Sequence, residues 1–402
     1  MTLDLRARIA AIVERDRARS ARVEASAGRP REPDPAPGGW TAEGPRAVGS
    51  RTESGGTPPR REGFGGPPHG ADRNERGFSL REQRIAIDDL GLEVVGRAAP
   101  EAGVLAHLGL RGDPPASWDD VLFLDTETTG LSGGTGTYVF LLGTAHFSDG
   151  ELVLRQHVLH DLAREREFVA AIHAELGRFR ACASYNGKCF DLPLLRSRVT
   201  LALRAELSVD ESHLDLLHPA RRLWKDRFGS TTLRQLEESV LDDPRVDDVS
   251  GALIPERYFR YLRVRDPGIL EPILAHNARD VVSLVRISDL VARAVILARS
   301  GRAPDHAPAA LALARVFERT GETEAAFCCY ESAYADGDLT VRTRAALPYA
   351  RALERRGDVT RAVTMLETLL ALGAGSETWR EQAEARLRRL SRIEMRRLAV
   401  AG

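Results

Sequence analysis

Three apolar runs that follow one another between residues 121 and 159 constrain the fold of this chain most strongly. Val121–Leu124, Tyr138–Phe147 and Glu151–Leu159 each have the length and composition of a buried strand. The last two runs are joined by Ser148–Gly150, a segment typical of a tight hairpin. The sequence therefore predicts three consecutive strands in an antiparallel meander.

Strands and helices alternate downstream of the meander. Apolar runs predict further strands at Ala181–Tyr185 and His213–Leu217. Helical periodicity predicts five helices, at Ala163–Phe179, Leu192–Glu206, Thr232–Val240, Pro255–Arg263 and Ile269–Ala298. This order predicts an α/β domain over residues 78–299, with a mixed sheet and flanking helices.

The two ends of the chain differ from this central part. Residues 1–77 are mostly rich in Pro, Gly and Arg and are predicted to be disordered, apart from a short charged helix at Leu3–Ala27. Residues 304–402 read as helix pairs, and Leu313–Gly337 matches Tyr349–Gly373 after a shift of 36 residues. The period resembles tetratricopeptide-like repeats. An all-α helical-repeat domain is therefore expected, packed on the long helix, either as a stabilising bundle or as a site for a protein partner.

Composition excludes several classes of protein. The chain has 402 residues, 29% of them charged, and no apolar run long enough for a transmembrane helix, so we expect a cytoplasmic protein without a membrane partner. Its cysteines, Cys182, Cys189, Cys328 and Cys329, lack the spacing of a zinc site and are expected to be free thiols. A net charge of -1 argues against coating of nucleic acid by a uniformly basic surface.

Two acids follow the first strand of the meander. Asp125 and Glu127 stand two residues apart, so their side chains project on the same side of the strand. Hydrolysis of a phosphodiester by two metals needs carboxylates that hold divalent cations about 4 Å apart. Mg²⁺ and Mn²⁺ prefer such oxygen ligands. Taken alone, the pair is equally consistent with a solvated turn.

Three motifs in order resemble those of DEDD-type 3′-5′ exonucleases, which are related to proofreading domains. The first is Asp125–Gly130 (DTETTG), and the second is Tyr185–Pro193, which contains Asp191. The third is His276–Asp280 (HNARD), in which the first and last residues share a helix face. More closely, Leu131–Tyr138, Ile254–Leu262 and the trailing helices resemble the YprB-like branch of RNase H-like proteins. The predicted order of strands and helices fits the RNase H-like layout.

The resemblance implies a role for each acid. Asp125 would bridge two divalent metal ions, Glu127 and Asp280 would complete the shell of one, and Asp191 would serve the other, partly through water. His276 would orient or deprotonate the attacking water, a role that suits an imidazole near physiological pH. His276 stands four residues before Asp280. Exonucleases of the histidine type usually place it five before, and the four-residue spacing usually carries tyrosine.

Other residues near the motifs have both a functional and a structural interpretation. Thr128 and Thr129 would contact the terminal nucleotide, or else satisfy their own backbone in a turn. Asn186 and Lys188 would orient the acid and a phosphate, or else belong to an Asn-Gly turn. Gly133–Gly136 lacks the lysine of a P-loop, and we interpret it as a tight turn.

Two basic segments are candidates for contact with nucleic acid. Arg221–Lys225 interleaves charge with a tryptophan that can stack on a base. The last predicted helix carries an arginine stripe at Arg386, Arg388, Arg389, Arg392, Arg396 and Arg397. Most such stripes are solvated helix faces, and Glu384 stands four residues before Arg388, a spacing that supports a helix by itself.

The sequence thus predicts a metal-dependent nuclease, most simply a 3′-5′ exonuclease on DNA or RNA that uses two Mg²⁺ or Mn²⁺ ions. Two alternatives remain open. One is a catalytically silent nucleic-acid-binding or scaffold protein, which the presence of all four acids disfavours. The other is a structure-selective endonuclease, which would use the same metal chemistry on a differently threaded substrate.

Overall fold

The structure is a computed structural model that describes residues 77–97, 103–109, 114–130, 136–207, 212–246 and 248–401. The helix predicted at Leu3–Ala27 and the Pro- and Gly-rich segment after it lie outside the described residues. Most of the glycine turn at Gly133–Gly136 does as well.

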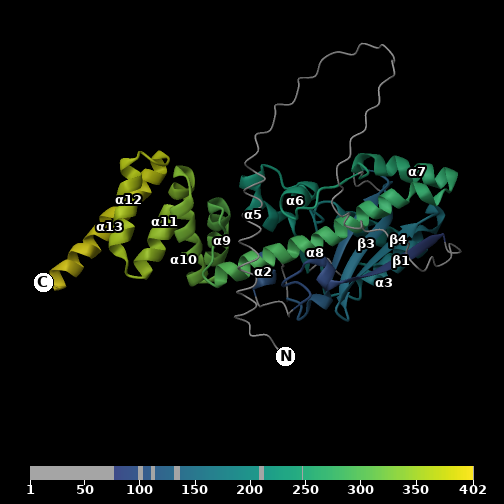
Figure 1. The fold of residues 1–402 in the computed structure, drawn as a ribbon, viewed down its shortest axis with the longest axis horizontal. Helices are drawn as coiled ribbons and strands as arrows, with labels where there is room; N and C mark the ends of the chain where they lie inside the picture. Colours follow the sequence, from purple (N-terminus) through teal and green to yellow (C-terminus); the bar gives the residue numbers. More distant parts are fainter. Residues whose placement is uncertain are drawn as a thin grey trace, which may run out of the picture.

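A six-stranded mixed sheet forms the centre of the α/β part (Figure 1). Its strands are β1 (Phe78–Ala86), β2 (Val121–Thr128), β3 (Val139–Ser148), β4 (Glu151–Leu159), β5 (Ala181–Ser184) and β6 (His213–Asp215). They lie in the order β1-β4-β3-β2-β5-β6. The β1, β4, β3 and β2 neighbours are antiparallel, whereas β5 and β6 continue the sheet parallel to β2. The predicted meander is therefore confirmed.

Two parts of the sheet differ from the prediction. The strand β1 was not predicted, because it lies at the sheet edge and its sequence, FSLREQRIA, is largely exposed and charged rather than apolar. The predicted strand His213–Leu217 ends early, at Asp215, and helix α5 (Leu217–Phe228) begins two residues later. The Asp215 side chain accepts a hydrogen bond from the Leu217 backbone N–H, which fixes the start of this helix.

Helices cover both faces of the sheet. They are α2 (Val104–Leu108), α3 (Glu165–Leu176), α4 (Asp191–Leu203), α5, α6 (Leu233–Ser239), α7 (Ile254–Val264) and α8 (Glu271–Arg299), with short 3-10 turns between some of them. Phe123, Phe147 and Leu154 pack in the same apolar core as α8. Leu122 and Phe140 point to the opposite face and pack with α3, α4 and α7. This alternation leaves the end of β2 facing α8.

Helices α9 (Ala307–Thr320), α10 (Thr323–Asp336), α11 (Leu339–Arg355), α12 (Val359–Ala371) and α13 (Glu377–Ala401) form the C-terminal helical region. Successive helices pack on one another, and the row extends from the end of α8 away from the sheet (Figure 1). Gly321 and Gly357, which the internal match aligns, both follow a helix with positive φ. Among the described residues, no helix is both long and apolar enough to cross a membrane.

Candidate active site

Asp125 is positioned by a row of residues across three strands. It lies opposite Gly143 on β3, which in turn lies opposite Gln156 on β4. The Asn277 side chain from α8 reaches over this row, and a Cβ atom on Gly143 would lie 2.2 Å from its Oδ1. A glycine is therefore required where the helix side chain approaches the sheet.

The buried Asn277 amide fixes the orientation of the Asp125 carboxylate. Its Nδ2 donates to Asp125 Oδ2 at 2.9 Å, while its Oδ1 accepts from Gln156 Nε2 at 3.0 Å. Gln156 Nε2 also donates to the Leu274 carbonyl at 2.8 Å. Neither amide was predicted from the sequence. The available signal for Asn277 was its place inside the motif His276–Asp280, and the structure shows it fully buried.

Asp191 approaches the same end of β2 from the first turn of α4. Its Oδ1 accepts from the Thr126 hydroxyl at 2.5 Å and from the Thr126 N–H at 3.2 Å. Its carboxylate is therefore tied to the residue between Asp125 and Glu127. Three of the predicted acids thus meet at the carboxyl end of one buried strand.

The loop before Asp191 is held by Asp215 at the end of β6. The Asp215 carboxylate accepts the backbone N–H groups of Asn186, at 2.8 Å, and Lys188, at 3.2 Å. Asn186 adopts a positive φ of 63°, as expected for an Asn-Gly turn, and the Lys188 side chain is exposed. The structure thus shows a turn-forming role for these two residues, and their contact with substrate stays a prediction.

His276 and Asp280 come from successive turns of α8 on the face next to Glu127. His276 Nε2 lies 3.9 Å from Glu127 Oε1 and 3.6 Å from Asp280 Oδ2. On the other side of the ring, Nδ1 lies 2.8 Å from Asp248 Oδ1. A carboxylate only accepts, so donation by Nδ1 to Asp248 would leave the lone pair of the neutral imidazole on Nε2, which faces the acids.

Arg245, in the loop between α6 and α7, joins several of these groups. It donates to both oxygens of Glu237, to Asp248 Oδ2 at 2.8 Å and to Asp280 Oδ1, and its Nη1 lies 3.1 Å from His276 Nδ1. The Arg245 side chain is 3% exposed and that of Glu237 is fully buried. Arg245, Asp248 and Glu237 were not predicted, because neither α6 nor the loop after it matches a motif and only the fold brings them to the site.

Burial raises the pKa values of all four predicted acids, and repulsion from the neighbouring acids of the cluster adds to it for Asp125 and Glu127. For Asp125, burial and then the charges of Asp280, Glu127 and Asp191 raise the pKa well above its usual range. Burial and the charges of Asp280 and Asp191 raise the pKa of Glu127 to about 8. Burial raises the pKa of Asp191 to about 6 and also raises that of Asp280. Raised pKa values in a cluster of carboxylates are typical of functional sites.

The donor set fits a hard divalent cation. All four acids offer oxygen, and Asn277, Thr126 and Arg245 fix one oxygen on Asp125, Asp191 and Asp280 respectively, which holds these carboxylates toward the cluster. The arrangement is nevertheless open. In the part of the chain that the structure describes, no three His, Cys, Asp or Glu side chains already surround one point as metal ligands would.

The remaining candidates lie at the margin of the cluster or away from it. The Thr128 hydroxyl donates to the Gly130 carbonyl at 2.8 Å, and the Thr129 hydroxyl accepts the Tyr138 N–H at 2.9 Å, so both serve the turn. In the arginine stripe of α13, Arg389 pairs with Glu354 and Arg388 with Glu384. The four cysteines are free thiols, as predicted.

Comparison with known proteins agrees with this fold. Residues 122–292 match the model of the RNase H superfamily. Over 209 residues the chain is 34% identical to "Uncharacterized protein YprB" of Bacillus subtilis (strain 168), a match that covers 52% of this chain and 50% of that protein. The chain thus spans about half the length of this relative.

One similar solved structure is the family B DNA polymerase from the hyperthermophilic archaeon Pyrobaculum calidifontis. The match covers 54% of this chain and 29% of the polymerase, with 22% identity and a TM-score of 0.34. The family match, together with the mixed sheet and its flanking helices, identifies the α/β part as RNase H-like. Proteins of this superfamily are generally nucleases that use divalent metals.

Proposed function

We propose that the protein is a metal-dependent nuclease that hydrolyses phosphodiester bonds of DNA or RNA, acting as a 3′-5′ exonuclease. One observation carries the proposal: Asp125, Glu127, Asp191 and Asp280 converge in a largely buried cluster, where the charges of neighbouring acids raise the pKa values of Asp125 and Glu127. A protein gains nothing in stability from gathering buried acids, so such a cluster points to a function that uses their charge.

The four acids would hold two Mg²⁺ or Mn²⁺ ions. When bound, such ions supply an activated water and stabilise the leaving oxygen. The chain's own contribution is orientation: Asn277 holds Asp125, Thr126 holds Asp191, and Arg245 holds Asp280. These three carboxylates would therefore lose little conformational freedom when they bind the cations.

His276 is the residue that would accept the proton from the attacking water. With Nδ1–H donated to Asp248, Nε2 would be the basic nitrogen, and it faces the acids. Burial works against ionisation of Asp248, but hydrogen bonds from Arg245 and His276 lower its pKa. An ionised Asp248 stabilises the imidazolium that forms on proton uptake. This arrangement supports a histidine base at the four-residue spacing.

The test is a panel of single- and double-stranded DNA and RNA, labelled at either end, incubated with Mg²⁺ or Mn²⁺. We expect wild type to shorten substrates from the 3′ end and Asp125→Asn to leave them intact. Cleavage of a circular substrate would instead indicate an endonuclease. A protein that degrades none of these substrates with either metal would refute nuclease activity.

The Arg245–Asp280 ion pair favours a second candidate, a catalytically silent nucleic-acid-binding protein. A guanidinium already neutralises Asp280, as a metal otherwise would. Isothermal titration with Mn²⁺, together with the cleavage assay, distinguishes the two candidates. The nuclease binds Mn²⁺ through the acids, cleaves, and loses both properties in Asp125→Asn, whereas Mn²⁺ binding without turnover indicates the silent protein.

A further inference from the structure

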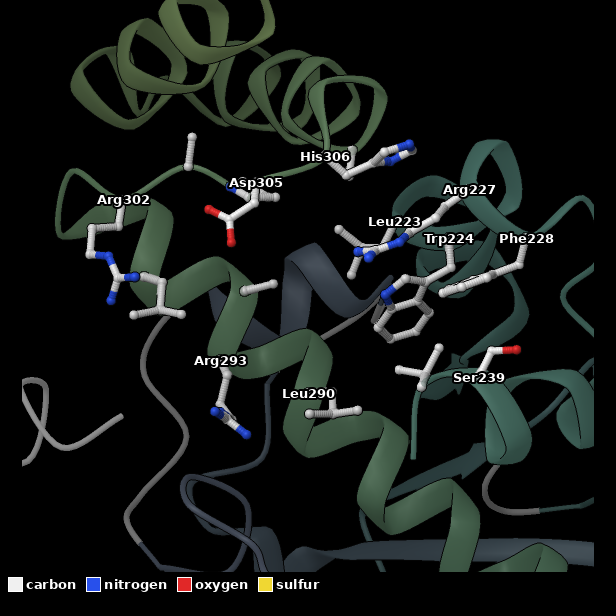
Figure 2. A pocket seen from close by; sticks show the side chains of 16 residues that line it. Leu223, Trp224, Arg227, Phe228, Ser239, Leu290, Arg293, Arg302, Asp305 and His306 are labelled. Atoms are coloured by element: carbon white, nitrogen blue, oxygen red, sulfur yellow. The ribbon is translucent and has the colours of Figure 1, made fainter. Parts of the chain in front are cut away.

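A cavity lies where the RNase H-like part meets the C-terminal helices. It has a volume of about 150 Å³ and is enclosed by α5, the end of α6, the second half of α8 and the segment that leads into α9 (Figure 2). Figure 2 shows Trp224, Phe228 and Arg227 on one side of it and Arg302 and Asp305 on the other. The predicted site residues do not line this cavity.

One wall of the cavity is aromatic and apolar. Trp224 and Phe228 come from α5, and both are only partly buried. Leu290, Ala294 and Leu297 of α8 form the adjoining surface. A cavity of about this volume accommodates a ring of roughly the size of benzene. The wall therefore suits a flat ring that stacks on the Trp224 indole.

The rest of the lining is basic. Arg227, Arg293 and Arg302 contribute three guanidinium groups against one carboxylate, that of Asp305. Arg293 is already engaged with Glu93, at 3.4 Å. Arg227 contacts the Phe228 ring, 5.5 Å from its centroid, and no carboxylate within the described ranges forms an ion pair with it.

Two buried donor positions in this lining have no hydrogen-bond partner among the described residues. They are Arg302 Nη1 and His306 Nδ1. Buried polar groups in folded proteins almost always have partners, so these atoms point to a ligand that supplies acceptors. His306 is also the N-cap residue of α9, so the positive end of that helix dipole lies at the same place. An anion is the ligand that satisfies all of these groups.

The cavity shares a helix face with the acid cluster. His276, Asp280, Leu290, Ala294 and Leu297 fall within one stripe of α8, by the periodicity of the helix. Ten residues separate Asp280 from Leu290, which corresponds to about 15 Å along the axis. Between these positions the same stripe carries Ser283 and Ile287, which are buried, and Ser283 donates to Glu237 of α6. A strand that ends at the acids would therefore have to pass over α6 to reach the cavity.

We propose that the cavity binds one nucleotide unit, with its base stacked on Trp224 on one side and its phosphate held by Arg302 on the other. The inference rests on the proposed function where it identifies the ligand as a nucleotide of the substrate strand. A free nucleotide offers the same chemistry. The stacking residue comes from the basic and aromatic segment Arg221–Lys225, which has no role in the acid cluster.

The test is equilibrium binding in EDTA, which keeps it independent of cleavage. The probes are fluorescein-labelled oligothymidylate, measured by anisotropy, and thymidine monophosphate, measured by calorimetry. The variants are Arg302→Gln, Trp224→Leu and the conservative Trp224→Phe. Arg344→Gln on α11 is the matched control, because this arginine is exposed and lies outside the cavity. Circular dichroism establishes that each variant is folded.

We expect Arg302→Gln and Trp224→Leu to weaken binding by at least about fivefold, the lower end of what loss of a stacked base costs. Trp224→Phe and the control should bind as wild type does. Weakened binding of the oligonucleotide alone identifies a strand as the source, and weakened binding of the mononucleotide alone identifies a free nucleotide. Unchanged affinity for both probes in both variants, or no binding by wild type, overturns the proposal.

The outcome is separable from that of the proposed nuclease activity. A protein that cleaves nothing but shows these affinity differences refutes the nuclease and retains the nucleotide site. A protein that cleaves its substrates but shows unchanged affinities refutes the nucleotide site alone.

Discussion

The RNase H-like part and the C-terminal helices treat buried polar groups in opposite ways. In the α/β part, Gln156, Asp191, Asp215, Glu237 and Asn277 are all buried. Within α9–α13, as far as the structure describes them, Thr343 is the one buried polar or charged side chain. The cores of those helices are filled largely by alanine, leucine and tyrosine. The α/β part thus retains buried polar and charged side chains, which lower stability, and the C-terminal helices contain almost none among their described residues.

One ion pair from each region shows the same difference. Arg245 and Glu237 are almost wholly enclosed, whereas Arg361 and Glu331, which bridge α12 and α10, are 49% and 41% exposed. Buried pairs are expensive to assemble and more expensive to break, while exposed pairs matter little. This contrast indicates that the α/β part gives up stability to hold charge in place. Four substitutions test it, and they follow from the largest expected effect to the smallest.

Asp125→Asn should lower cleavage activity and raise the stability of the metal-free protein. Metal-dependent cleavage should fall by about a thousandfold or more, because a metal ligand worth several kcal/mol is lost. The metal-free protein should become more stable, since a carboxylate with a raised pKa no longer has to be accommodated. Nuclease assays and urea denaturation in EDTA measure the two effects.

The control for Asp125→Asn is Glu367→Gln, which neutralises an exposed acid on α12. It should leave cleavage unchanged and alter stability by less than about 0.5 kcal/mol. A metal-free Asp125→Asn protein that is clearly less stable than wild type would contradict the idea that the acids repel one another.

Arg245→Leu should destabilise the protein by about 3 to 5 kcal/mol, because Glu237 is left as a buried charge without its partner. Arg245→Lys keeps the charge and should recover only part of the loss, since an ammonium group cannot reproduce the fork of bonds to Glu237, Asp248 and Asp280. Denaturation midpoints measure both variants. If Arg245→Leu lowers the free energy of unfolding by less than about 1 kcal/mol, the Arg245–Glu237 ion pair contributes no more than an exposed pair does.

The metal-free protein should lose stability as the pH rises. The folded pKa of Glu127 is raised from 4.5 to about 8, so its contribution is present at low pH and is lost as the pH rises through about 8. The expected loss is a few kcal/mol, at about 1.4 kcal/mol per pKa unit. Thermal unfolding in EDTA across this range measures it. Glu127→Gln should flatten the profile, and Mg²⁺ should stabilise wild type most at high pH. An unchanged slope in the variant would rule out Glu127 as the source.

Arg361→Gln should have the smallest effect of the four. The pair with Glu331 spans 2.8 Å but is exposed, so its loss should cost less than about 1 kcal/mol. Even that difference should vanish in high salt, because exposed charges are screened. Denaturation with and without added salt provides the measurement. A cost comparable to that of Arg245→Leu would remove the contrast between the two regions.

The parts of the fold and of the site that depend on local sequence patterns could be predicted from the sequence. The meander from β2 to β4 follows from apolar runs and a Ser-Asp-Gly hairpin, and Asp125 and Glu127 share a face because strands alternate. His276 and Asp280 share a face because the helix repeats every 3.6 residues. Each of these relations is set within a few residues of chain, and local sequence is sufficient to predict it.

The supporting residues could not be found in the same way. Asn277 reaches Asp125 only because Gly143 leaves room for it, and Arg245 reaches Asp280 only because a loop 35 residues earlier folds back on α8. The edge strand β1 has no apolar alternation, so only pairing with β4 defines it. These are tertiary relations between distant segments, and no periodicity in a single segment records them.

The continuity of α8 has a mechanical consequence. It runs unbroken from Glu271 to Arg299, and 29 residues correspond to about 44 Å. His276 and Asp280 sit near one end of this rod, and α10 packs against it. Asp125 and Asp191, by contrast, are anchored in the sheet and at its edge. Two groups of the site therefore belong to α8, and the other acids belong to β2 and α4. A displacement of α8 by the C-terminal helices would move His276 and Asp280 relative to Asp125 and Asp191.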